Sequence, residues 1–144
     1  MKPSPSILAE IKATEALRLQ AYMPTPNDVP TIGYGSTGPD IHLGLVWTKA
    51  QAEARFAQFC DKLAVQMTSA LTGYPTTQKQ FDAMFSLAYN IGIAAFLRSS
   101  VLREHRAKHY FEAKKSFGLW VKQAGKVLRG LVTRRAREAD IYDD

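Results

Sequence analysis

Apolar residues recur at helical spacing along most of the chain, which predicts a protein that is mainly α-helical. The first such stretch runs from Ile7 to Leu19 and follows Ser6, a residue type that commonly caps the N-terminus of a helix. Pro3 and Pro5 keep the helix from starting earlier. We therefore expect the first helix to begin after Ser6 and to end at Glu15, although apolar residues continue at helical spacing to Leu19.

Two longer helices are predicted to begin at capping boxes, in which a Thr and a Gln three residues later each bond a backbone N–H. Thr48 and Gln51 form the first box, and its helix extends to about Leu71. One side of this helix is apolar and contains Ala52, Phe56, Phe59, Leu63 and Met67. Thr77 and Gln80 form the second box. The helix that follows it is apolar around most of its circumference, so we expect it to be central and buried.

The sequence pattern of the remaining C-terminal part predicts shorter helices. Ser99 or Ser100 caps a helix that ends near residue 108. The pattern then predicts a helix over 110–120, a loop over 125–130 and a basic terminal helix over 131–142.

Residues 22–47 differ from the rest because they are rich in proline and glycine. Two short runs, 31–34 and 43–47, are typical of β-strands between turns. The aromatic residues of this segment need burial, which favours a small β-lobe over a linker. The predicted fold class is therefore α+β: a single, mostly helical domain over residues 1–144, with a β-hairpin lobe at about 21–47 inserted after the first helix.

A pair of carboxylates lies where the first helix meets the lobe. Glu15 ends the apolar-periodic stretch, Asp28 lies in the proline-rich turn, and Thr31 begins the next strand. Two carboxylates on opposite sides of a sugar linkage are the usual catalytic groups of glycoside hydrolases. Each residue also has an ordinary structural explanation: a helix carboxylate paired with Arg18, a turn-forming Asp and a β-branched strand residue. The residue types alone leave both explanations open.

Several separated motifs resemble those of one enzyme family. Glu15–Tyr22, followed by Pro30–Gly35, is similar to the signature of the phage lysozymes of glycoside hydrolase family 24, the muramidase endolysins that open bacterial cell walls. The likeness continues through the family's central helix, the segment after it and its closing stretch, at residues 80–92, 95–100 and 120–138. These motifs occur in the family's order and cover most of the chain.

The resemblance implies a lysozyme-like fold and hydrolysis of the β-1,4 bond between N-acetylmuramic acid and N-acetylglucosamine in peptidoglycan, for host cell lysis. It implies that Glu15 protonates the leaving oxygen while Asp28 and Thr31 position a water. The other expected site residues are the substrate contacts Tyr34, Gly35 and Asn90 and the supporting residue Arg18. Tyr34 also suits packing, and Asn90 also suits a bond that satisfies a polar group on an apolar helix. No metal ion or organic cofactor is expected.

The chain departs from the family pattern at three positions. Ala16 follows Glu15 where the family usually has Gly, and Ser36 follows Gly35 where many members have His. Pro24 occupies the position at which the family usually has its second catalytic carboxylate, in a turn that is one residue longer than the common form. Asp28 is the only carboxylate in this turn, so it is the candidate replacement.

The formal net charge of +6 indicates an anionic partner. Basic residues gather in the C-terminal half, and Arg134, Arg135 and Arg137 are expected on a solvated face that steers the protein to the wall. The expected partner is the glycan strand of peptidoglycan, bound by a monomer, with no nucleic acid and no stable membrane insertion.

The N-terminal residues lack the apolar core of a signal peptide or signal anchor, and no apolar run reaches the length of a membrane span. We therefore expect the protein to stay in the host cytoplasm until a holin or a similar pore releases it to the periplasm. Cys60, the single cysteine, is expected to be a small buried hydrophobe. His42, His105 and His109 show no metal-ligand spacing with carboxylates and are expected at the surface.

Three alternative functions remain open at the level of sequence. A lytic transglycosylase would cleave the same bond with Glu15 but without the groups that position water. A catalytically impaired relative would only bind the cell wall, with Pro24 marking a lost acid. A nucleic-acid binder is suggested by the net charge alone. An anhydro-sugar end in the product would distinguish the transglycosylase from the hydrolase.

Overall fold

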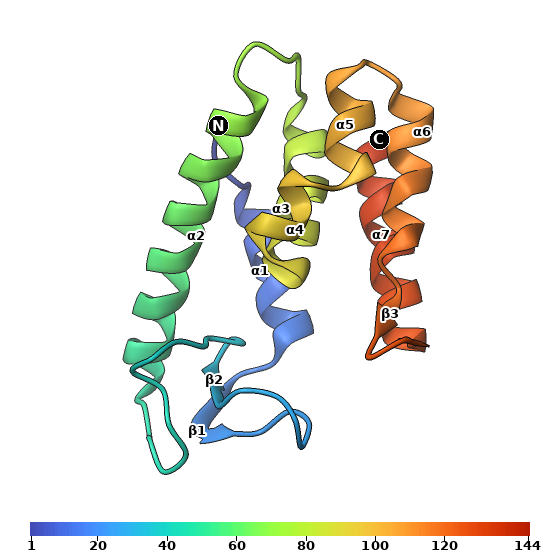
Figure 1. The fold of residues 1–144 in the computed structure, drawn as a ribbon. Helices are drawn as coiled ribbons and strands as arrows, with labels where there is room; N and C mark the ends of the chain where they lie inside the picture. The colour runs from blue at the N-terminus through green and yellow to red at the C-terminus, as the bar shows by residue number, and fades with distance from the viewer. The chain divides into compact units, whose positions relative to one another are not determined.

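The computed structural model describes residues 1–144, which form two compact units (Figure 1). Unit 1 contains Met1–Ile7 and Leu63–Asp144, and unit 2 contains Leu8–Lys62. Helices α1 (Pro5–Glu15) and α2 (Lys49–Leu71) each pass from one unit into the other. No helix combines the length and the apolar character that crossing a bilayer would require.

Unit 2 contains the small β-lobe that the proline- and glycine-rich segment predicted. Strand β1 (Arg18–Tyr22) pairs antiparallel with β2 (Thr31–Gly33). The predicted strand at 43–47 is reduced to a single bridge between Gln20 and Val46, although Ala21 N–H donates to the Leu45 carbonyl over 2.9 Å. The lobe begins at Arg18, before the predicted residue 21. A mostly helical chain with a hairpin lobe after its first helix confirms the α+β prediction.

A small core holds the lobe together. Ala21, Ile32 and Ile41 are buried in it, and Leu45 and Trp47 pack against them. Gly33 has a φ of +68°, and a Cβ built there would lie 3.1 Å from the Trp47 ring, so this position favours glycine for two reasons.

The first helix begins earlier than predicted and ends at Glu15 as predicted. It begins at Pro5, and the Ser4 hydroxyl, not that of Ser6, accepts a hydrogen bond from Ile7 N–H (3.2 Å) as a cap does. It ends at Glu15 because Ala16 takes a left-handed conformation with φ of +58°. The apolar residues up to Leu19 therefore do not continue the helix, and Leu19 lies in β1 with 39% of its surface exposed.

Helix α2 confirms its capping box. Thr48 N–H donates to Gln51 Oε1 (2.8 Å), and Gln51 N–H donates to Thr48 Oγ1 (3.2 Å). The predicted burial of Phe59 is wrong, since this ring is 46% exposed, and the neighbouring Cys60 occupies the buried side instead. Residue 60, not 59, lies at the i+4 position from Phe56 and continues its stripe. Burial raises the pKa of the Cys60 thiol to about 12, as expected of a small buried hydrophobe.

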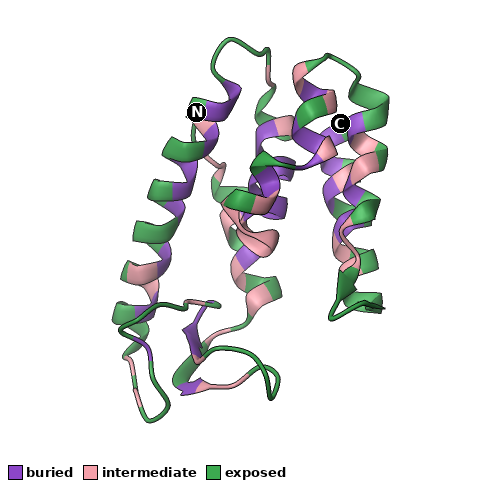
Figure 2. Ribbon diagram, viewed as in Figure 1, coloured by how far each residue is buried: buried purple, intermediate pink, exposed green.

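Helix α3 (Gln78–Ile91) is the buried centre of unit 1, as predicted. Thr77 caps it with a complete capping box. Every residue from Phe81 to Ala88 is buried, and Figure 2 shows α3 largely purple where it is visible. Helix α3 packs against α7 (Arg129–Asp143), the last helix of the chain.

The remaining elements of unit 1 are short. The predicted helices correspond to α5 (Ser100–Arg106), which Ser99 caps, and to α6 (Tyr110–Ser116), which continues as the 3₁₀ helix η1 (Phe117–Leu119). Helix α4 (Ile93–Leu97) and the hairpin of β3 (Lys122–Gln123) and β4 (Lys126–Val127) were not predicted. The residues between the two strands, Ala124 and Gly125, both have positive φ, as a type I′ turn requires.

A buried ion pair within α7 is hydrogen-bonded to α3. Arg135 is 1% exposed and its Nε lies 2.6 Å from Oε1 of Glu138, whose Oε2 accepts a hydrogen bond from the Ser86 hydroxyl (2.5 Å). Burial raises the pKa of the Glu138 carboxyl, and the Arg135 guanidinium opposes that effect. Placing Arg135 on a solvated face was therefore wrong. Removing one member of such a pair alone costs roughly 3–5 kcal/mol, so Arg135 is a structural residue.

His105 also lies inside unit 1 and not at the predicted surface. It is 1% exposed, with Nδ1 2.7 Å from the Tyr142 hydroxyl and Nε2 2.9 Å from the Thr76 hydroxyl. Burial lowers the pKa of the imidazole because a charged ring is poorly solvated there. His42 and His109 are exposed, as predicted.

The burial of His105 predicts a pH-dependent stability. The unfolded chain binds a proton with a pKa of about 6.5, whereas the folded state resists protonation, so stability is retained above about pH 6.5 and falls as the pH decreases below it. The variant His105→Gln cannot titrate and should flatten this part of the curve. Urea unfolding between about pH 8 and pH 5 measures the effect. A curve in His105→Gln that is unchanged from that of the parent would contradict the explanation.

Candidate active site

Glu15 lies at the very end of helix α1, and its carboxyl faces Gly35. The carboxyl is half-buried, and a Cβ built on Gly35 would lie 2.9 Å from its Oε2. Gly35 has a φ of +82°, which disfavours any other residue. The structure thus brings together two of the predicted site residues, with the Glu15 carboxyl next to the space that a side chain at residue 35 would occupy.

The left-handed residue after Glu15 ends the helix in a recognisable way. Ala16 N–H donates to the Lys12 carbonyl over 3.1 Å, the bond of a left-handed helix cap. Such a position usually contains Gly, because a Cβ crowds the following carbonyl. Ala16 therefore carries a steric cost at the point that fixes the direction of the chain after Glu15.

Asp28 and Thr31 both bond to one residue, Val29. Asp28 Oδ1 accepts a hydrogen bond from Val29 N–H (2.8 Å), and the Thr31 hydroxyl donates to the Val29 carbonyl (3.0 Å). Asp28 is exposed and its N–H closes a turn onto the Thr25 carbonyl (3.1 Å), whereas Thr31 is buried. The turn thus holds both side chains in defined positions, and their role in catalysis stays a prediction.

Tyr34 is bound by contacts within unit 2. Its hydroxyl donates to Glu53 Oε1 over 2.7 Å, its ring meets Phe56 edge-on at 5.4 Å between centroids, and it is 7% exposed. The bond to Glu53 raises the pKa of the Tyr34 hydroxyl. These contacts account for Tyr34 as a packing residue, and its contact with substrate stays a prediction.

Sequence reasoning missed Glu53 and its second partner, Lys12. Lys12 Nζ lies 2.5 Å from Glu53 Oε2. The available signal was periodicity: Lys12 lies one turn before Glu15, and Glu53 lies next to the buried Ala52 at the edge of the apolar stripe of α2. Neither residue stands out by type in a chain with many charged residues.

The two other predicted site residues have partners of their own. The Arg18 guanidinium lies 4.0 Å from the centroid of the Tyr22 ring, a cation–π contact along β1. In unit 1, Asn90 Oδ1 accepts a hydrogen bond from Nη1 of the buried Arg135 over 2.8 Å. Arg135 thus provides the hydrogen-bond partner that Asn90, a polar residue on an apolar helix, requires.

Residues 12–138 match the sequence model of the family described as phage lysozyme. This chain belongs to the phage lysozyme family. It is 39% identical to the endolysin of Bacillus phage PZA over 134 residues, which cover 92% of this chain and 52% of that endolysin. The chain therefore spans about half the length of that relative.

Solved structures give the same assignment for the fold of this phage lysozyme. The endolysin from Escherichia coli O157:H7 phage FAHEc1 superposes with a TM-score of 0.86 at 36% identity, covering 100% of this chain and 94% of that one. The muramidase domain of SpmX from Asticaccaulis excentricus has a TM-score of 0.85 at 33% identity, with 98% and 97% covered. The lysozyme-like fold expected from the motifs is confirmed.

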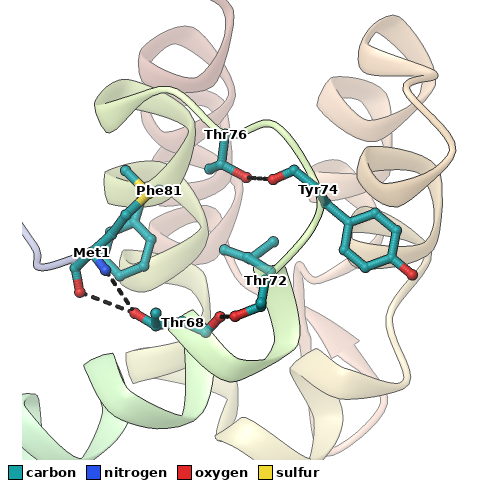
Figure 3. Close-up of a pocket in the computed structure, with 7 residues that line it drawn as sticks. Met1, Thr68, Thr72, Tyr74, Thr76 and Phe81 are labelled. Atoms are coloured by element: carbon teal, nitrogen blue, oxygen red, sulfur yellow. Dashed lines mark hydrogen bonds between the residues drawn. The ribbon is translucent and has the colours of Figure 1, made fainter.

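The protein also has a pocket of about 230 Å³ in unit 1 (Figure 3). Its polar groups are mainly threonine hydroxyls, and each is bonded to a nearby backbone carbonyl: Thr68 to Met1, Thr72 to Thr68 and Thr76 to Tyr74. The remaining lining residues are Leu71 and Phe81. This pocket has no carboxylate, so it does not offer the acid chemistry found at Glu15.

The strained cap at Ala16 predicts that glycine stabilises this phage lysozyme. Ala16→Gly relieves the contact of a Cβ in left-handed backbone and should raise the free energy of unfolding by about 1 kcal/mol. Ala13→Gly, in the body of the same helix, is the matched control and should lower it by a similar amount. Denaturant unfolding of both variants provides the comparison. If Ala16→Gly destabilised the protein as Ala13→Gly does, the strain at this cap would be disproved.

Proposed function

We propose that this protein is a peptidoglycan-hydrolysing endolysin that cleaves the β-1,4 bond between N-acetylmuramic acid and N-acetylglucosamine. The observation that carries the proposal is the position of Glu15, which ends α1 with its carboxyl against the backbone of Gly35. A carboxyl beside exposed, side-chain-free backbone can meet a sugar linkage closely. Membership of the phage lysozyme family and the likeness to a muramidase domain support the same reaction.

In the proposed mechanism Glu15 is the general acid. It donates its proton to the glycosidic oxygen as the bond breaks, while Asp28 and Thr31 hold a water on the opposite face of the sugar. The shared bonds to Val29 support a joint role, because they fix the relative positions of the Asp28 and Thr31 side chains. Each proposed step uses a carboxyl or hydroxyl group of the chain itself.

The proposed biological role is host cell lysis. We place the protein in the host cytoplasm until a holin or a similar pore gives it access to peptidoglycan in the periplasm. We also propose that it acts as a monomer, since one chain contains the whole candidate catalytic set. Exposed cations such as Lys115, Lys122 and Arg129 would draw it to an anionic wall. Arg135 is buried and would not take part in this attraction.

The role of Glu15 is tested by Glu15→Gln, which keeps the size and polarity of the side chain but has no proton to donate. We expect lysis of outer-membrane-permeabilised cells to fall by about two orders of magnitude or more, with the fold retained. Clearing rate and thermal unfolding measure the two properties. Near-normal lysis by this variant would disprove the mechanism.

The role of Asp28 is tested by Asp28→Asn. An Asn is well tolerated in such a turn, so stability should be nearly unchanged while the rate falls sharply. Asp28→Glu should lose activity as well, because one added methylene displaces the carboxylate.

Full activity in Asp28→Asn would remove Asp28 from the mechanism. The Asp28 bond to Val29 N–H is also what an ordinary turn would contain, which keeps a lytic transglycosylase as the second candidate. Mass spectrometry of the released glycans distinguishes the two reactions: a hydrolase leaves a reducing end and a transglycosylase leaves an anhydro-sugar end.

A further inference from the structure

Two side chains of unit 2 meet at the carboxylate of Glu53. Its Oε2 lies 2.5 Å from Lys12 Nζ, and its Oε1 accepts a hydrogen bond from the Tyr34 hydroxyl over 2.7 Å. The Lys12 ammonium also lies over the rings of Tyr34 and Phe56, at 5.5 and 5.1 Å from their centroids. Each oxygen of one carboxylate therefore holds one partner.

The two partners of Glu53 lie close in sequence to Glu15 and to Gly35. Lys12 lies three residues before Glu15 on α1, and its carbonyl accepts the Ala16 N–H that closes the helix. Tyr34 directly precedes Gly35, whose backbone lies against the Glu15 carboxyl. Glu53 itself lies in the first turns of α2, a 23-residue helix. One carboxylate on a long helix thus connects both sides of the Glu15–Gly35 contact.

We propose that Glu53 is a positioning residue for Glu15, which sets the separation between the end of α1 and the Gly35 backbone by holding Lys12 and Tyr34. This inference rests on the proposed function, since it concerns the geometry of the same reaction. Glu53 does not touch the reacting atoms. Its effect is exerted through the backbone that carries Glu15 on one side and Gly35 on the other.

The charges and exposure of the cluster indicate a larger effect on rate than on stability. The bonds from Lys12 and Tyr34 hold the pKa of Glu53 below its usual range, so the carboxylate is ionised at neutral pH. The Lys12 and Glu53 side chains are 34% and 36% exposed, and ion pairs with such access to water contribute little to stability. Catalysis is more sensitive, because a displacement of about 1 Å can reduce a rate by about 100-fold.

A second ion pair on α2 provides a matched control. Arg55 Nη1 lies 2.7 Å from Asp40 Oδ2, and its Nη2 donates to the Thr37 carbonyl over 3.2 Å. This pair also joins α2 to the lobe and is similarly exposed, at 29% and 59%. It holds the 37–40 loop and not the segment next to Glu15, so Asp40→Asn tests the general effect of loosening the lobe.

The experiment measures kcat, KM and thermal unfolding on purified peptide-free glycan strands, by release of reducing ends. We expect Glu53→Ala to lower kcat by about tenfold or more with little change in KM, while Asp40→Asn stays within about twofold of the parent. Glu53→Gln keeps an acceptor for Tyr34 and should recover part of the loss. Tyr34→Phe removes one hydroxyl and should lower kcat, and adding it to Glu53→Ala should cost little more, since the two act through one contact.

The outcomes separate the positioning role from its alternatives. Equal kcat in Glu53→Ala and Asp40→Asn would overturn the inference and leave the proposed function intact. If Glu53→Ala fails to fold, Tyr34→Phe decides: a lower kcat at constant KM supports positioning, whereas a raised KM at constant kcat would make Tyr34 a substrate contact and overturn it. A parent protein that releases no reducing ends would overturn the proposed function and, with it, this inference.

Discussion

The left-handed turn at Ala16 determines the position of everything around Glu15. A helix that continued through Leu19, as the apolar pattern suggested, would carry Arg18 and its neighbours on helical faces. The reversal at Ala16 instead sends the chain into β1, where Arg18 pairs with Gly33. Ala16 lies two residues before Arg18 and Gly35 lies two residues after Gly33, so antiparallel pairing returns the Gly35 backbone to the end of the helix. The contact between Gly35 and the Glu15 carboxyl follows from this register.

The contacts that surround this turn reinforce the same geometry. Lys12 supplies the carbonyl that closes the helix, and its ammonium is held by Glu53 on α2. Across the hairpin, the turn before β2 fixes Asp28 and Thr31 through the two polar groups of Val29. The candidate acid and its proposed water-positioning partners thus lie on short backbone segments whose orientation depends on a few hydrogen bonds. Small changes in these segments should affect rate more than stability.

The sequence predicted those elements that carry a local signal. The Thr48 and Thr77 capping boxes, the apolar α3 and the lobe all follow from residue types and spacing, and the motifs located Glu15. The left-handed residue that ends α1 was missed because this position normally contains glycine, and Ala16 adopts the same backbone against its preference. Arg135 and His105 were placed at the surface because residue type favours exposure. Arg135 is buried with its ion-pair partner Glu138 on the same helix and donates to Asn90 on α3, and His105 is buried against the Tyr142 hydroxyl.

The central claim is that the Glu15 carboxyl meets the scissile linkage beside Gly35. A crystal structure of Glu15→Gln with a bound peptidoglycan glycan strand tests it most directly, through the distance from the side-chain amide of residue 15 to the glycosidic oxygen. The account predicts a hydrogen-bonding distance of about 3 Å, with the linkage lying against the Gly35 backbone. A glycan bound with its linkage away from residue 15 would contradict the account.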